Sequence, residues 1–151
     1  MYNRKIVPTN FKVPEKYETD TFLLTPLNVN DLIQDYEAVM VSVGHLKGLM
    51  DQSVWPEGLT IEDNLVDLGW HQREFSLAHS FAYAVRGTQN KTYLGCCYIY
   101  PSNDRRFEIQ VFYWIREDRN PEVLEMQLGE CLRDWLKTSW PFSTVDYPGR
   151  V

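Results

Sequence analysis

Cysteine is scarce in this sequence, with only 3 in 151 residues. Cys96 and Cys97 are adjacent on a predicted strand and therefore point to its opposite faces, while Cys131 falls on a predicted helix. This spacing fits neither a disulfide framework nor a set of metal ligands. We interpret all three cysteines as small core residues, and we predict no metal site.

Long apolar runs and an excess of basic residues are missing as well. No stretch approaches the roughly 20 apolar residues that cross a bilayer, so we expect a soluble protein without a membrane partner. The first residues, up to Asp20, have no apolar signal-peptide core and carry Lys5, Lys12 and Lys16, which predicts a cytoplasmic location. Lys and Arg number 15 against 21 Asp and Glu, a net charge of −6, which argues against a nucleic-acid partner.

Motifs of nucleotide binding and hydrolysis are also absent. The sequence contains no Gly-x-Ser-x-Gly, no Walker loop and no dinucleotide fingerprint. His45, His71 and His79 show neither an HxxxH pattern nor a Cys-His spacing. From spacing alone, we interpret them as structural or surface residues.

What is present predicts one globular domain. The chain is 44% hydrophobic, 14% aromatic and 24% charged, which is typical of a folded protein with a single core. Only the polar, proline-containing start resembles a linker. We therefore expect a polar N-terminal segment over residues 1–20 and a single domain over residues 21–151.

Hydrophobic periodicity and turn residues predict the order β-α-α-β-β-β-α-β. Asn28 to Asp31 suit a helix start, Thr60 to Asp63 approximate a capping box, and Pro121 is favoured in a first helical turn. We expect the first helix to end near Gly44 or Gly48 and the second near His79. The predicted strands cover residues 21–26, 81–85, 93–100, 107–115 and 142–147. The last strand follows a helix and so should pair in parallel, which predicts an α+β fold with a mixed, mostly antiparallel sheet.

Two segments resemble a known family. The run Gln110 to Ile115 is similar to Glu-Ile-Gly-Tyr-Trp-Leu on the fourth strand of the GNAT acyltransferase superfamily, and an amphipathic helix follows it at the family's distance. The start of the chain resembles the Pro-x-x-Leu-Glu-Thr-Glu-Arg-Leu-x-Leu-Arg-Pro-Leu opening of ribosomal-protein and antibiotic N-acetyltransferases in that superfamily, and here reads Pro14-x-x-Tyr17-Glu18-Thr19-Asp20-x-Phe22-x-Leu24-x-Pro26-Leu27. The resemblance covers most of the chain, and it implies the GNAT fold and transfer of an acyl group from coenzyme A to an amine.

The resemblance also implies where acetyl-CoA would bind as co-substrate. In the family the fourth and fifth strands separate, and the fourth strand hydrogen-bonds the pantetheine arm as though it were another strand. The pyrophosphate then lies at the N-terminus of the following helix. Carried onto this sequence, the cofactor contacts fall on Tyr113, Trp114, Ile115, Arg116 and Arg119, with the phosphate loop over residues 117–123.

The phosphate loop departs from the family's Gln/Arg-x-x-Gly-x-Gly/Ala. Residues 119–124 contain no glycine, and Pro121 lacks an N–H donor. Glu117, Asp118 and Glu122 add negative charge beside the expected pyrophosphate. Pro121 and Glu122 are also ordinary helix-start residues, so a purely structural interpretation stays open.

The catalytic positions depart too. The family's fourth-strand Glu corresponds to Gln110, which leaves Glu108, two residues earlier, as the candidate base. Tyr147 is the candidate acid for the leaving thiolate. The alternatives are a solvated or paired carboxylate for Glu108 and a core residue for Tyr147.

The remaining expectations concern the acceptor and the partners. The resemblance places Trp55, Trp70 and His71 on the acceptor side, where they would bind a small-molecule or peptide amine, although Trp70 also suits the core. The family's final helix and strand are absent after residue 151, which leaves a sheet edge that a homodimer could cover. Two functions stay open: an acetyl-CoA-dependent N-acetyltransferase, and a non-catalytic module that binds a small ligand or serves assembly.

Overall fold

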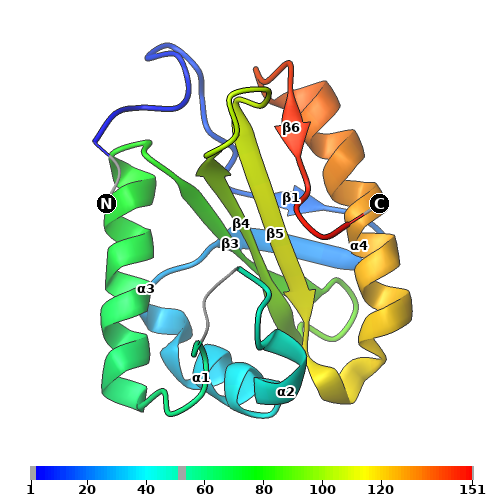
Figure 1. Ribbon diagram of the computed structural model, residues 1–151. Helices are drawn as coiled ribbons and strands as arrows, with labels where there is room; N and C mark the ends of the chain where they lie inside the picture. The colour runs from blue at the N-terminus through cyan, green and yellow to red at the C-terminus, as the bar shows by residue number, and fades with distance from the viewer. Residues whose placement is uncertain (1–2, 51–53, 151) are drawn as a thin grey trace.

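A computed structural model describes residues 3–50 and 54–150 as one mixed sheet with helices on both faces (Figure 1). The sheet has six strands in the order β1-β2-β3-β4-β5-β6, and every neighbouring pair is antiparallel except β5 and β6. The strands are β1 Tyr17–Glu18, β2 Phe22–Pro26, β3 Phe81–Gly87, β4 Tyr93–Pro101, β5 Ile109–Ile115 and β6 Val145–Asp146. The mixed sheet predicted from the sequence is confirmed.

The helices lie between these strands. They are the 3-10 helices η1 Val29–Asp31 and η2 Glu117–Arg119 and the α-helices α1 Leu32–Met40, α2 Val43–Leu46, α3 Ile61–Ser76 and α4 Pro121–Ser139. Capping boxes at Asn28 and Thr60 fix the starts of η1 and α3. None of the helices in the described parts of the chain is both long and apolar enough to cross a bilayer.

The sheet separates two apolar cores, because alternate residues of each strand point to opposite faces. The first core joins β3, β4 and β5 to α4 through side chains such as Tyr83, Ile99 and Leu132. The second core packs side chains such as Ala84 and Trp114 against α1 and α3. Figure 1 shows α3 and α4 on opposite sides of the sheet.

Close packing of β4 on β5 requires glycine at one position. A Cβ atom on Gly95 would lie 1.9 Å from the carbonyl oxygen of Trp114. Such a distance is well inside van der Waals contact, so no other residue fits without moving the backbone.

Several details differ from the expectations. The last strand, predicted over residues 142–147, is only Val145–Asp146, and α3 ends at Ser76 and not near His79. The first helix ends at Met40 and α2 begins at Val43, rather than one helix running to Gly44 or Gly48, because the Ser42 hydroxyl donates to the Ala38 carbonyl where the chain turns. The polar N-terminal segment packs on the domain: Val7 is buried in the first core, and residues 17–18 add strand β1. Its scattered apolar residues find partners only in the tertiary structure.

Candidate functional site

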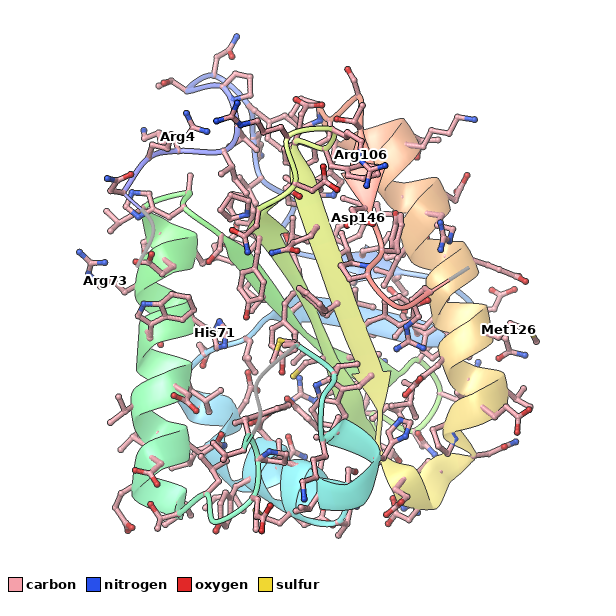
Figure 2. The ribbon with its side chains drawn as sticks, in the orientation of Figure 1. Arg4, His71, Arg73, Arg106, Met126 and Asp146 are labelled. Atoms are coloured by element: carbon pink, nitrogen blue, oxygen red, sulfur yellow. The ribbon has the colours of Figure 1, made fainter. Side chains whose placement is uncertain are left out.

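The parallel pairing of β5 and β6 is short, because β6 ends after two residues. The two strands pair only at Ile109 with Val145 and at Gln110 with Asp146, while β5 continues to Ile115. Figure 2 shows Asp146 beside β5. A groove of about 900 Å³ opens at this point, lined by Gly48, Leu49, Met50, Trp70, Tyr100, Asn103, Asp104, Gln110, Phe112, Asp146, Pro148 and Gly149.

A smaller pocket of about 210 Å³ continues from this groove between α1, α3 and β4. The two share Met50, Trp70 and Tyr100 as lining residues. All three residues predicted to face the acceptor, Trp55, Trp70 and His71, line this pocket, so the structure brings them together. Their role in binding an acceptor stays a prediction. We call this cavity the acid–aromatic pocket; its lining residues are Leu27, Asp35, Met50, Trp55, Asn64, Asp67, Leu68, Trp70, His71, Tyr98 and Tyr100.

Two carboxylates give the acid–aromatic pocket its charge. Asp35 is buried and accepts hydrogen bonds from the Tyr93 hydroxyl at 2.5 Å, the Asn64 amide at 2.9 Å and the Cys96 thiol at 3.3 Å. Burial raises the pKa of Asp35. Burial, followed by the neighbouring carboxylates of Asp63 and Asp35, also raises the pKa of Asp67.

His71 points from α3 toward the sheet, whereas Arg73 points away from it (Figure 2). The His71 ring stacks on Tyr98 with centroids 5.3 Å apart and meets the edge of Trp70 at 5.0 Å. Its Nδ1 atom is buried and has no hydrogen-bond partner among the described residues. Burial lowers the pKa of His71 to about 4, so the ring is neutral at neutral pH.

The free edge of β5 beyond Gln110 is occupied by side chains. Arg150 donates one hydrogen bond to the Tyr113 carbonyl at 2.5 Å and another to Glu125 at 2.9 Å. Glu125, on α4, accepts from the Ile115 N–H at 2.9 Å and pairs with His45 of α2. We call His45, Glu125 and Arg150 the edge clamp: Glu125 and Arg150 bond the main-chain groups that a neighbouring strand or an extended ligand would use, and His45 pairs with Glu125.

Two residues predicted to bind the cofactor do not face that edge. The Trp114 carbonyl lies against Gly95 of β4, and its buried indole donates to the Tyr98 hydroxyl at 3.0 Å. The Arg116 N–H donates to Leu94, again on the β4 side. Strand alternation therefore turns the main-chain groups of Trp114 and Arg116 toward β4 and those of Tyr113 and Ile115 toward the free edge, and the cofactor contacts of these residues stay predictions.

The start of α4 is acidic, as the sequence indicates. The Arg116 guanidinium is buried and already paired with Glu37 and with Asp118 at 2.6 Å. These carboxylates raise the pKa of Arg116 and neutralise its charge. Arg119 is exposed, 3.7 Å from Asp118. Of the two predicted cations, only Arg119 has a side chain open to an anionic ligand.

The two predicted catalytic residues lie outside the groove. Glu108 is exposed just before β5, and its carboxylate accepts hydrogen bonds from the Ser143 and Thr144 N–H groups, which holds the turn before β6. Tyr147 packs its ring 4.0 Å from the Arg133 guanidinium on the α4 side. Burial raises the pKa of Tyr147 to about 12. Neither residue lines the groove, and their catalytic roles remain predictions.

Sequence reasoning missed Asp35, Asn64 and Asp67 in the acid–aromatic pocket. Asn64 lies at helical spacing from Leu68, and Asp35 lies between Leu32 and Val39 on the apolar face of α1. A polar residue on an apolar stripe was therefore an available signal. The edge clamp gave no such signal, because its members are far apart in the sequence.

Comparison with solved structures places this fold among GNAT-family acetyltransferases. The ribosomal-protein-S5-alanine acetyltransferase of Vibrio fischeri aligns with a TM-score of 0.62 at 13% identity, over 80% of this chain and 66% of that one. RimL, a ribosomal L7/L12 alpha-N-protein acetyltransferase solved with coenzyme A, aligns with a TM-score of 0.63 at 14% identity. The alignment covers 85% of this chain and 70% of RimL. The microcin C7 self-immunity acetyltransferase MccE, solved with acetyl-CoA and AMP, aligns with a TM-score of 0.62 at 8% identity. The alignment covers 85% of this chain and 71% of MccE.

This chain therefore spans about two thirds of the length of the structures that it resembles. No protein-family model and no curated protein sequence matches it. At sequence identities this low, the structural likeness establishes the fold alone. The GNAT fold that the sequence resemblance implied is confirmed.

Proposed function

We propose that this protein is an N-acetyltransferase that moves the acetyl group of acetyl-CoA to a small amine. The observation that carries the proposal is the end of β6 after two residue pairs with β5, which leaves the rest of β5 without a neighbouring strand, and a groove of about 900 Å³ at this point. The groove joins a pocket of suitable chemistry for an amine. The shared fold with acetyltransferases, two of them solved with coenzyme A or acetyl-CoA, supports the same conclusion.

In this proposal the donor binds along β5. The Tyr113 carbonyl and the Ile115 N–H are the main-chain groups on the free edge, and the amide groups of a pantetheine arm have the matching donors and acceptors. Arg150 and Glu125 hold these groups in the structure, so binding requires an exchange of partners at both. The diphosphate would face the first-turn N–H groups of α4 and Arg119, against the charge of Glu122.

We assign the proton-accepting role to Asp146. The carboxylates that line the groove belong to Asp104 and Asp146. Arg106 holds Asp104 through hydrogen bonds of 2.7 to 3.2 Å and lowers its pKa to about 2, which makes Asp104 a weak base. Glu108 is committed to the turn before β6.

The chemical step in this proposal is a direct displacement. The neutral amine nitrogen attacks the thioester carbonyl, the C–N bond forms and the C–S bond breaks. Asp146 accepts the proton that the nitrogen loses, through water where the two are not in contact. The leaving thiolate takes a proton from solvent or, in the role that the family resemblance implies for it, from Tyr147.

Steady-state kinetics with acetyl-CoA and a panel of amines test this proposal, with free thiol as the readout. We expect measurable turnover in the wild type, a loss of about 100-fold in kcat for Asp146→Asn, and little change for Glu108→Gln. Glu108→Gln keeps a side-chain oxygen for the turn, so it is a matched control. Equal activity of wild type and Asp146→Asn would overturn the assignment, and loss in Glu108→Gln with a shifted pH profile would return the role to Glu108.

A second candidate is a non-catalytic protein on the same fold. The observation that favours it is the edge clamp, which satisfies β5 with side chains of the protein itself. Calorimetric titration of acetyl-CoA separates the two candidates. Absence of heat and of thermal stabilisation at millimolar acetyl-CoA would favour the non-catalytic protein, because a ligand of the folded state must raise its stability.

The homodimer and the cytoplasmic location remain predictions. Light scattering coupled to size-exclusion chromatography checks the first, and a monomer at high concentration would contradict it. The acceptor amine is the finer part of the proposal and is argued below.

A further inference from the structure

The acid–aromatic pocket is lined by two carboxyl groups and by no side chain that is positively charged at neutral pH. Asp35 and Asp67 are among its lining residues, and none of those residues is Lys or Arg. His71 is neutral at neutral pH. An anionic ligand would therefore meet only repulsion here, whereas a cation would be attracted.

Asp67 is the lining carboxylate whose side chain has no partner among the described residues. In residues 3–50 and 54–150 no ion pair or hydrogen bond involves its side chain, while Asp35 already accepts three hydrogen bonds. The buried Nδ1 atom of His71, one helical turn further along α3, also lacks a partner. Buried polar atoms are normally satisfied, so the unpartnered Nδ1 of His71, one helical turn from the half-buried carboxylate of Asp67, indicates a missing polar group between α3 and the sheet.

The walls of the pocket specify the kind of cation. Four aromatic side chains line it besides His71, namely Trp55, Trp70, Tyr98 and Tyr100. Aromatic faces attract organic ammonium groups and pack against their alkyl chains. Among the described residues no group of three or more His, Cys, Asp or Glu could hold a metal ion, which argues against a metal.

The volume of the pocket and its connection to the groove restrict the size and shape of the ligand. A volume of about 210 Å³ admits a short alkyl chain rather than a folded peptide segment. Met50, Trp70 and Tyr100 continue into the groove that contains Asp146. A ligand anchored at Asp67 can therefore reach the groove with its other end.

We infer that the acid–aromatic pocket binds the ammonium end of a small aliphatic diamine through Asp67 and His71, and directs the second amine into the groove. The second amine is the acetyl acceptor, so this part rests on the proposed function. The anchoring itself needs no acyl donor. Asp35 supplies negative potential, and the aromatic side chains enclose the alkyl chain.

Calorimetry without any acyl donor tests the anchoring. We expect diaminobutane and butylamine to bind at neutral pH, and butanediol, which has the same length and no charge, not to bind. Asp67→Asn should weaken diaminobutane binding about tenfold or more. Glu62→Gln removes the same charge from an exposed position on the same helix and should leave the affinity unchanged. His71→Phe keeps an aromatic ring, removes Nδ1 and should also weaken binding.

The outcomes separate this inference from the proposed function. Equal binding of diaminobutane and butanediol, no binding of either, or an unchanged affinity in Asp67→Asn would overturn the inference. Diamine binding without any acetyl transfer would uphold the anchoring and overturn the proposed reaction. Acetyl transfer to butylamine at the rate measured for diaminobutane, with no effect of Asp67→Asn on KM, would overturn the diamine assignment and leave the transferase intact.

Discussion

Arg150 contacts Tyr113 in two ways. Its guanidinium donates a hydrogen bond to the Tyr113 carbonyl and lies 4.1 Å from the centre of the Tyr113 ring. The same guanidinium bonds Glu125, whose other oxygen accepts from the Ile115 N–H. An exposed strand edge is normally covered, and here side chains cover it where the next strand has turned away.

Removing Arg150 should therefore open the edge of β5. We expect Arg150→Met to bind acetyl-CoA about tenfold more tightly than the wild type, because the ligand no longer competes with a charge-assisted hydrogen bond. Isothermal titration calorimetry measures the change. Arg133→Met is a matched control, since Arg133 is also an arginine that lies over a tyrosine ring, that of Tyr147. Weaker binding in Arg150→Met would show that Arg150 holds the ligand instead of excluding it.

Glu122 should weaken binding of any ligand that carries phosphates. Its carboxylate lies in the first turn of α4, where the helix dipole otherwise favours an anion. We expect Glu122→Gln to bind acetyl-CoA about threefold more tightly at low salt, with a smaller difference at high salt because exposed charges are screened. Glu130→Gln, further along the same helix, is the control. No difference between the two variants at low salt would place the phosphates away from α4.

His71 should make stability depend on pH. Burial lowers its pKa to about 4, whereas the unfolded chain titrates near 6.5. Between these two pKa values the unfolded chain binds more protons than the folded protein, so the free energy of unfolding rises with pH from about 4 to 6.5. Above this range the contribution of His71 no longer changes with pH. We expect the pH dependence of the free energy of unfolding to be less steep in His71→Phe than in the wild type, by up to about 1.4 kcal/mol per pH unit.

Urea denaturation at a series of pH values measures the slope for both proteins. Asp35 and Asp67 line the same pocket and have raised pKa values, but they are present in both proteins, so the difference between the curves isolates His71. Parallel curves from pH 4 to 6.5 would contradict the burial of a neutral imidazole.

Gly95 should tolerate no side chain. The added Cβ of Gly95→Ala would lie 1.9 Å from the Trp114 carbonyl oxygen, so β4 and β5 must move apart. We expect the free energy of unfolding to fall by about 3 kcal/mol. Gly69→Ala provides the opposite case, because nothing lies within 4 Å of its Cβ position in α3, and a gain of about 0.5 to 1 kcal/mol is expected. Chemical denaturation that ranks the two variants equally would contradict the packing of β4 on β5.

The order of elements could be predicted because local signals agree with the tertiary structure. Pro121 begins α4, and the alternation from Phe81 to Val85 sets β3. The break between α1 and α2 could not be predicted, since it depends on Ser42, whose hydroxyl accepts from the distant Glu117 N–H. Strand β1 was missed for a similar reason, because two residues carry no period of their own.

The aromatic part of the candidate site could be predicted, since Trp55, Trp70 and His71 all line the acid–aromatic pocket. Trp70 and His71 are neighbours on α3, and the structure places both at the acid–aromatic pocket. Glu108 was chosen for its distance from Gln110, but the turn before β6 supplies two N–H groups that take its carboxylate. The edge clamp depends on the docking of α2 and α4, which no sequence spacing encodes.

The division of the molecule into two cores also divides its tryptophans. Trp55 and Trp70 line the acid–aromatic pocket and Trp114 is buried in the second core, whereas Trp135 and Trp140 pack together in the first core. Intrinsic fluorescence therefore carries two separable signals: ligand entry quenches or shifts the emission of the first pair, and loosening of α4 exposes the second. Replacing Trp70 or Trp135 by phenylalanine assigns each signal, and an unlabelled sample then reports binding and unfolding independently.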